Sequence, residues 1–302
     1  MIQTYIQLVP LFFTFILGIF LRRIRFAEAE HGRFLLKFMF FITLPALVFL
    51  KISQIELDAQ TLVLPLANIG VNLGCMLVTL SLAPVFNVQR QTLGAMLVCT
   101  MITNNAFMFP FMLAIYGDEG FAYAILFDFG NALITSTLTY ALAFRYGPDA
   151  HTSRTLFTKT MKSPIVWALF AAVTVNLLVI PVPKVVEIVL EPLAGMTNPL
   201  ILISLGILFT PRLNQLRLLS ATLFIRMGVG MMLGVTVARL FGLDDLAFTI
   251  VVLCAAAPIG FNALTYSTLA GLDTEFTSSA VSSSILVGLF YLPLLMYLMT
   301  LF

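Results

Sequence analysis

The chain has 302 residues, of which 60% are hydrophobic and only 10% are charged. Soluble domains are closer to half apolar and a quarter charged, so this composition excludes a soluble domain and indicates a protein whose main solvent is lipid. The formal net charge of +2 is too small to indicate nucleic acid as a partner.

The first apolar run, Tyr5 to Leu21, is predicted to be a membrane span and not a cleaved signal peptide. A signal peptide has basic residues before its apolar run and small residues at a cleavage site after it. Here the basic residues Arg22, Arg23 and Arg25 follow the run instead. We therefore expect an uncleaved first span with its N-terminus outside.

Further apolar stretches follow, each close to the ~20 residues that cross the hydrocarbon of a bilayer. The longest polar connection, 147–162, divides the chain nearly in half, and the other connections leave no room for a soluble domain. The sequence therefore predicts an all-α integral membrane protein with ten transmembrane helices. The predicted spans are 4–22, 33–50, 61–85, 91–115, 121–146, 163–182, 186–208, 217–240, 246–270 and 276–301.

The Lys and Arg residues are distributed unequally over the alternate connections of this topology. Of the 16, eleven fall on one side and three on the other, while Lys37 and Arg226 fall inside spans. Because positive residues are retained in the cytoplasm, the richer side is predicted to be cytoplasmic, with both termini outside the plasma (inner) membrane. The richer side holds Arg22, Arg23, Arg25, Arg33, Arg90, Arg145, Arg154, Lys159, Lys162, Arg212 and Arg217, and the poorer side holds Lys51, Lys184 and Arg239.

The two halves of the chain repeat one another at a nearly constant offset of 154 or 155 residues. Five is an odd number of spans, so the second half must enter the membrane from the opposite side, which predicts an inverted repeat. The predicted domains are a first five-helix repeat at 1–146, a cytoplasmic linker at 147–162 and a second, inverted repeat at 163–302. The matching pairs are Pro10 and Pro164, Pro45 and Pro199, Gly74 and Gly228, Cys99 and Cys254, Asp118 and Asp273, and Phe121 and Phe276.

The fourth and ninth spans contain the candidate substrate site. Both carry asparagine and proline near the middle of an apolar segment: Asn104, Asn105 and Pro110 in one, Pro258 and Asn262 in the other. Proline removes a helical hydrogen bond, and backbone groups freed in lipid must face protein or a water-filled cavity. We therefore expect two broken helices that cross near the midplane, with half-helix N-termini that suit an anion. The alternative is that the prolines only kink the helices and the asparagines join neighbouring helices.

Two charged residues inside spans are candidates for coupling or for structure. Asp128, which is followed by Asn131, would carry a coupling proton, bind a cation, or partner a buried donor. Arg226 would balance an anionic substrate or pair with Asp128, and a structural role is favoured because arginine does not release its proton.

Other function classes lack their residues in this sequence. There is no phosphate-binding loop for ATP, no metal-ligand cluster and no nucleophile motif, so we expect no cofactor, no metal and no enzyme activity. The three cysteines Cys75, Cys99 and Cys254 lie in apolar stretches and are interpreted as small core residues.

Short motifs in several spans occur in the order found in a known family. They are Leu44-Pro45-Ala46-Leu47, Asp128-x-Gly130-Asn131-Ala132, Arg226, Pro258-x-x-x-Asn262-Ala263, Gly271-x-Asp273, Ser278-Ser279-Ala280 and Leu292-Pro293. With these motifs the whole chain resembles the auxin efflux carrier family, whose bacterial members include malate and malonate permeases.

The resemblance implies ten helices in two inverted halves, with crossed, proline-broken helices 4 and 9 around a carboxylate-binding site. It assigns that site to Asn104 or Asn105 with Pro110, and to Pro258 with Asn262. One segment departs from the family: Ala106-Phe107-Met108-Phe109 stands where a glycine-rich run is usual, so we expect a pocket of different shape.

These observations predict an alternating-access transporter of a small organic anion, a mono- or dicarboxylate such as malate, malonate or an auxin-like acid. The alternative is an ion or solute channel or a membrane sensor, although the polar residues cluster at one depth and do not line a continuous path. Coupling to a proton, to sodium or to neither is compatible with the sequence, as are a monomer and a homodimer.

Overall fold

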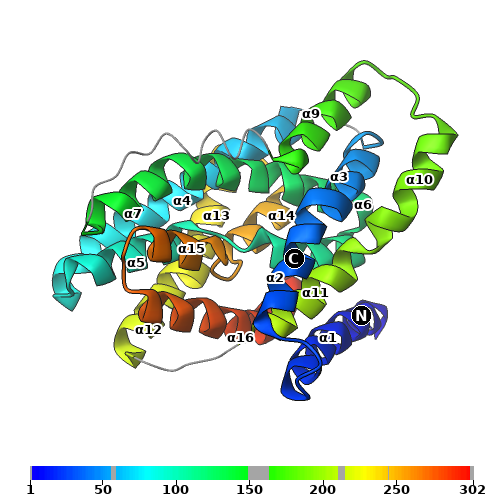
Figure 1. Cartoon of the computed structure of the whole chain (residues 1–302). Helices are drawn as coiled ribbons and strands as arrows, with labels where there is room; N and C mark the ends of the chain where they lie inside the picture. Colours follow the sequence, from blue (N-terminus) through cyan, green and yellow to red (C-terminus); the bar gives the residue numbers. More distant parts are fainter. Residues whose placement is uncertain (1, 56–58, 149–162, 210–214, 244, 300–302) are drawn as a thin grey trace. The chain divides into compact units, whose positions relative to one another are not determined.

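The computed structural model describes residues 2–55, 59–148, 163–209, 215–243 and 245–299, and the regular structure in these ranges is helical (Figure 1). The predicted linker 147–162 falls almost entirely outside the described residues, together with its basic residues Arg154, Lys159 and Lys162. Within the described ranges, six helical stretches are long and apolar enough to cross a membrane. This all-helical, apolar architecture is that of an integral membrane protein, as the composition predicts.

The six stretches are 29–52, 61–86, 105–146, 184–208, 216–240 and 274–299, and there are shorter apolar helices at 164–177 and 245–255. The stretch 105–146 is interrupted at Gly117, whose φ of 66° and ψ of −159° are not helical. The interruption falls in the predicted connection between the spans 91–115 and 121–146. A positive φ strains any residue with a Cβ, which explains the glycine at this position.

The described helices form two compact units, and each unit draws on both halves of the sequence. Unit 1 comprises Met1–Ala59, Ala106–Ile125 and Met161–Phe209, and unit 2 comprises Gln60–Asn105, Leu126–Thr160 and Thr210–Phe302. The packing units are therefore interleaved along the chain. These units do not coincide with the predicted repeats at 1–146 and 163–302, which are defined by matching sequence positions and stay a prediction.

In unit 1, α1 packs most extensively with α11, and α3 packs with α9; α2 also packs against α11, and α10 against α3. The first pair approaches closely at two glycines, because a side chain on Gly18 would collide with the backbone at Ile203 and Gly206. The helices of this unit are α1 (Ile2–Arg23), α2 (Ala29–Phe38), a π-helical turn (Met39–Thr43), α3 (Leu44–Ile52), α9 (Pro164–Leu177), α10 (Lys184–Gly195) and α11 (Thr197–Leu208), with the first part of α6 (Asn105–Ile134).

The ends of these helices are closed by side chains that bind backbone carbonyls. Arg22 Nη1 donates to the carbonyl of Ile207 at the end of α11, at 2.6 Å. Asn176 Nδ2 donates to the carbonyl of Ile52 at the end of α3, at 3.0 Å. The last carbonyls of a helix have no partner inside it, so each contact satisfies a group that the helix leaves open.

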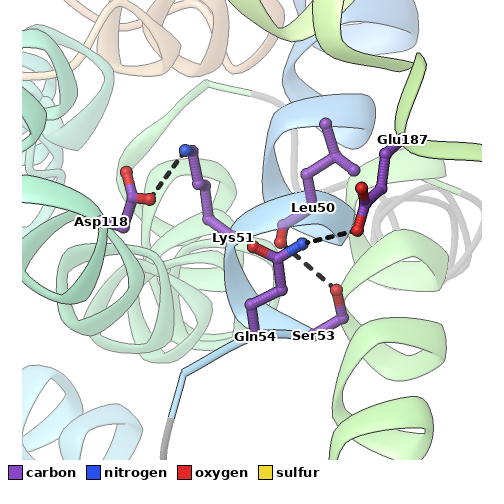
Figure 2. A network of polar contacts seen from close by, with 6 residues as sticks. All are labelled: Leu50, Lys51, Ser53, Gln54, Asp118 and Glu187. Atoms are coloured by element: carbon purple, nitrogen blue, oxygen red, sulfur yellow. Dashed lines mark hydrogen bonds and ion pairs between the residues drawn. The ribbon is translucent and has the colours of Figure 1, made fainter. Parts of the chain in front are cut away.

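Polar contacts gather around the end of α3 (Figure 2). Lys51 forms an ion pair with Asp118, with Nζ 2.8 Å from Oδ2. Gln54 Nε2 donates to Glu187 Oε1 of α10 at 3.4 Å. The side chain of Asp118 is 54% exposed and that of Glu187 is 24% exposed, so this network joins helix ends and not a buried core.

Unit 2 contains the helices that carry most of the candidate site residues. Its last helix begins at an N-cap, because the backbone N–H of Phe276 donates to Asp273 Oδ1 at 2.9 Å. The helices are α4 (Ala59–Phe86), α5 (Arg90–Met101), the end of α6, a π-helical turn (Thr135–Thr139), α7 (Tyr140–Tyr146), α12 (Leu216–Leu223), a π-helical turn (Phe224–Val229), α13 (Gly230–Leu240), α14 (Asp245–Ala255), α15 (Asn262–Leu269) and α16 (Thr274–Met299).

Candidate functional site

Two broken helices meet in unit 2. The first break lies between the end of α5 at Met101 and the start of α6 at Asn105. The second lies between the end of α14 at Ala255 and the start of α15 at Asn262. These are the fourth and ninth spans, so each predicted helix contains an unwound segment.

The two unwound segments pair with each other through their backbones. Thr103 lies opposite Ile259 in an antiparallel bridge. The N–H of Asn104 donates to the carbonyl of Pro258 at 2.8 Å, and the N–H of Gly260 donates to the carbonyl of Ile102 at 2.9 Å. Backbone groups freed inside a membrane protein must find partners in the protein. Each break therefore supplies the partners that the other break needs.

The approach of the two segments depends on a glycine. A Cβ on Gly260 would lie 2.8 Å from the side chain of Ile102 and 2.9 Å from the carbonyl oxygen of Thr103. Helix α16 also contacts the second break, because Ser284 Oγ accepts the N–H of Ile259 at 3.0 Å. A larger residue at position 260 would push the paired segments apart.

A carboxylate is held beside the first break by two amides. Asp128 Oδ1 accepts from Asn105 Nδ2 at 2.8 Å and from Asn131 Nδ2 at 2.9 Å. Asn131 also donates to the carbonyl of Thr103 at 3.3 Å, so the amide ties the carboxylate to the unwound segment. The half-buried Asp128 is thus oriented by neutral donors and not by a cationic side chain.

The guanidinium of Arg226 is fully buried, with 0% of the residue exposed. Nη1 donates to Asn72 Oδ1 at 3.1 Å and to the carbonyl of Thr100 at 2.8 Å, and Nη2 donates to the carbonyl of Ala255 at 2.7 Å. Thr100 lies in the last turn of α5 and Ala255 ends α14. One side chain therefore binds the ends of both half-helices that lead into the breaks.

Arg226 and Asp128 do not form a direct ion pair. Among the described residues, the ion pairs are Lys51 with Asp118 and Lys184 with Glu187. In the part of the chain that the structure describes, Arg226 is connected to Asp128 through Asn72 and Asn131, whose side chains are 3.5 Å apart. The predicted alternative in which Arg226 pairs directly with Asp128 is therefore wrong. Two neutral amide side chains lie between the two charges.

The structure places most of the predicted site residues at the two breaks, but they differ in burial and in position. Asn104 and Asn105 are buried at the start of α6, whereas Asn262 is exposed at the start of α15. Pro258 lies in the second break itself. Pro110 lies inside α6 and in unit 1, so the unwinding in the fourth span precedes the proline by several residues.

Three residues of the site were missed by sequence reasoning: Asn72, Thr100 and Ala255. A signal for the first exists, because Asn72 lies 154 residues before Arg226, the offset of the sequence repeat. The carbonyls of Thr100 and Ala255 carry no side-chain signal, because any residue has a carbonyl. In the described part of the chain, no group of three or more His, Cys, Asp or Glu residues is placed to hold a metal ion.

Comparison with known proteins places this geometry in a family. The family described as membrane transport protein matches residues 3–296, nearly the whole chain. The chain belongs to this family of membrane transporters. The match confirms the resemblance to the auxin efflux carriers that the motifs indicate.

Two archaeal relatives extend this result. An uncharacterized transporter of Methanocaldococcus jannaschii is 24% identical over 278 residues, which cover 88% of this chain and 89% of the relative. An uncharacterized transporter of Methanothermobacter thermautotrophicus is 27% identical over 206 residues, which cover 68% of this chain and 67% of the relative. The family and these relatives assign membrane transport to the chain, and membrane transport implies a small solute as substrate.

Proposed function

We propose that this transporter is an alternating-access carrier of a small organic anion, a mono- or dicarboxylate such as malate, malonate or an auxin-like acid. The observation that carries the proposal is the pairing of two broken helices, in which the N–H of Asn104 donates to Pro258 and the N–H of Gly260 donates to Ile102. Carriers commonly place the substrate where discontinuous helices meet, because half-helix ends offer unpaired polar backbone groups there.

The chemistry of the breaks favours an anion. Helices α6 and α15 begin at the breaks, and a helix N-terminus carries partial positive charge and free N–H groups. Asn262 is exposed at the first position of α15 and provides an amide donor. Arg226 binds the negative ends of α5 and α14, which leaves the partial positive charge at the starts of α6 and α15 to attract an anion.

Contacts inside each unit support the ten-helix inverted repeat. Arg22 and Asn176 are 154 positions apart, and each closes the end of a helix from the other half of the sequence. Asn72 and Arg226, also 154 apart, bind each other directly. A pseudo-two-fold axis places equivalent residues of the two halves in equivalent contacts, or in contact with each other.

The contacts also support the predicted division of the connections between two sides of the membrane, on which the proposed orientation with both termini outside the plasma membrane is based. Lys51 and Asp118 belong to connections predicted to be external, and Glu187 lies at the start of the predicted span 186–208, directly after another external connection. The three residues gather at one end of unit 1 (Figure 2). In unit 2, Arg90 donates to the carbonyl of Arg145, and both residues belong to connections predicted to be cytoplasmic. None of these three contacts, Lys51 with Asp118, Gln54 with Glu187 and Arg90 with Arg145, joins a predicted external segment to a predicted cytoplasmic one.

Asp128 is the proposed binding site for a coupling proton or sodium ion. Its carboxylate has no cationic partner, and Asn105 Oδ1, which is buried, has no hydrogen-bond partner among the described residues. The amide nitrogen of the same residue contacts Asp128, so the unpartnered oxygen lies close to the carboxylate. A carboxylate and a neutral oxygen together suit a small cation.

The proposal is tested by counterflow in liposomes that contain the purified protein. Labelled malate, malonate and indole-acetate are offered to vesicles preloaded with the unlabelled acid. We expect accumulation of at least one acid by the unmodified protein and loss of accumulation in Asn262→Ala. Gln54→Ala, at the other polar network, is the matched control and should transport normally.

Absence of counterflow with all three acids would overturn the proposed substrate class. A conductance that does not saturate, in place of counterflow, would favour a channel. Normal counterflow in Asn262→Ala would remove the second break from the substrate site.

A further inference from the structure

The side chain of Arg226 occupies a position that neither the transport proposal nor the family explains. It is a fully buried cation that forms no ion pair with any described residue, and its hydrogen bonds go to Asn72 and to two backbone carbonyls. Burying an uncompensated charge is costly, so something must balance it. The balance has to come from the groups that the guanidinium touches.

The groups that it touches are the C-terminal ends of two helices. The last carbonyls of a helix lack intrahelical partners and carry roughly half a negative charge in total. Thr100 and Ala255 supply such carbonyls from α5 and α14. Two helix ends therefore match one guanidinium in charge, and its flat fork of donors reaches both at once.

The local backbone makes room for this arrangement. Arg226 lies in the π-helical turn Phe224–Val229, a geometry that redirects a side chain relative to a regular helix. One turn later, a Cβ on Gly230 would lie 2.6 Å from the carbonyl oxygen of Ala255 and 2.8 Å from Nη2 of Arg226. Glycine at this position keeps the path between the guanidinium and α14 open.

We propose that Arg226 is a positioning residue that clamps the ends of α5 and α14 together and thereby keeps the two unwound segments paired. The carbonyls it binds come immediately before the segments that pair at Thr103 and Ile259. Without the clamp, two negative helix ends would face each other and separate. The inference concerns the breaks and not the solute, so it stands or fails independently of the proposed substrate.

The pairing is measured with a disulfide at the bridge. Thr103 and Ile259 form the type of antiparallel pair whose flanking residues are hydrogen bonded, with Cα atoms about 4.5 Å apart, within the range of a disulfide. Thr103→Cys and Ile259→Cys are combined in a background with Cys75, Cys99 and Cys254 replaced by alanine. Oxidation with copper phenanthroline is followed over time by mass spectrometry of the linked peptides.

A second cysteine pair in the same unit controls for general unfolding. The hydroxyls of Ser267 and Thr277 are 2.9 Å apart between α15 and α16, and both residues are fully buried. Ser267→Cys with Thr277→Cys should therefore also form a disulfide. Arg226 does not contact either residue, so the clamp should not affect this pair.

Arg226→Met should slow the 103–259 disulfide by about tenfold or more, because it removes the charge-assisted hydrogen bonds to both helix ends, and should leave the 267–277 disulfide unchanged. An unchanged 103–259 rate would overturn the proposal. A fall in both rates would overturn it too, because it would show a general structural role without a specific effect on the breaks.

Arg226→Lys provides the same test if the methionine variant does not fold. Lysine keeps the charge but replaces the flat fork with a single point donor, so it reaches one carbonyl better than two. We expect an intermediate 103–259 rate with a normal 267–277 rate. Equal rates in Arg226→Lys and the unmodified protein would overturn the need for a forked donor.

Discussion

The two units of this transporter bury polar groups to very different extents. Among the described residues, unit 1 buries three polar side chains, all hydroxyls: Thr43, Thr197 and Ser204. Unit 2 buries the guanidinium of Arg226 and the side chains of five asparagines. Unit 1 is thus an apolar assembly with polar contacts at its helix ends, whereas unit 2 has a polar interior in which each group depends on its neighbours.

This difference predicts which of the two units tolerates amino-acid substitutions better. An apolar helix pair loses a contact gradually when one side chain is altered, since the packing energy is spread over many atoms. A buried polar network loses more, because removing one partner leaves another group without a hydrogen bond. Substitutions in unit 2 should therefore cost more than matched substitutions in unit 1, and four comparisons test this expectation.

The largest difference is expected between two arginines. Arg226→Met removes three hydrogen bonds to a buried charge and should destabilise the protein by roughly 3–5 kcal/mol. Arg22→Met removes one hydrogen bond, to the carbonyl of Ile207, and should cost about 1 kcal/mol. Thermal unfolding of the purified proteins in detergent measures both. Equal losses would contradict the comparison.

The next comparison uses two glycines. Gly260→Ala places a methyl group against Ile102 and the carbonyl of Thr103, which should cost about 1–3 kcal/mol and reduce counterflow strongly. Gly195→Ala in unit 1 meets nothing within 4 Å and should be neutral or stabilising by up to about 1 kcal/mol. A tolerated methyl group at position 260 would show that the breaks are not tightly paired.

A third comparison concerns two aspartates and affects coupling more than stability. Asp128→Asn keeps an oxygen that accepts from Asn105 and Asn131, so the stability should change by about 1 kcal/mol or less. Transport driven by a proton or sodium gradient should be lost, while counterflow without a gradient should persist. Asp118→Asn in unit 1 should keep both activities. Gradient-driven uptake by Asp128→Asn would remove the coupling role.

The smallest effect is expected at the polar network of unit 1. Lys51→Met breaks the ion pair with Asp118, in which both side chains are partly exposed, and should cost about 0.2–1 kcal/mol. The cost should shrink further at high salt, because screening already weakens an exposed pair. A loss as large as that of Gly260→Ala would show that unit 1 is as sensitive as unit 2.

Much of the fold could be predicted because lipid restricts the choice of structure. Continuous apolar runs of about 20 residues indicate membrane-spanning helices, and proline with asparagine in the middle of such a run indicates where a helix is interrupted. The breaks in the fourth and ninth spans were found in this way. The starting residue of α6 is also understandable from the sequence, because Asn104 precedes the helix and asparagine is a favoured N-cap residue.

Other features could not be predicted because they depend on contacts between distant segments. Pro110 was expected to mark the interruption, but it is accommodated inside α6, and the unwinding is fixed by the backbone bonds to Pro258 and Gly260. The periodicity of one helix gives its apolar face but not its partner. For the same reason the sequence did not indicate that α1 packs with α11 and α3 with α9, which interleaves the two units along the chain.

The mutual pairing of the breaks has a consequence for how the sequence can evolve. A change that rewinds one break into continuous helix removes the partners of Pro258 and Gly260, or of Ile102 and Asn104, in the other. Neither break can be repaired or shifted alone without leaving buried backbone groups unbonded. Viable changes must therefore arrive as coordinated pairs, one in each break, so the two unwound segments should be among the slowest parts of this chain to diverge.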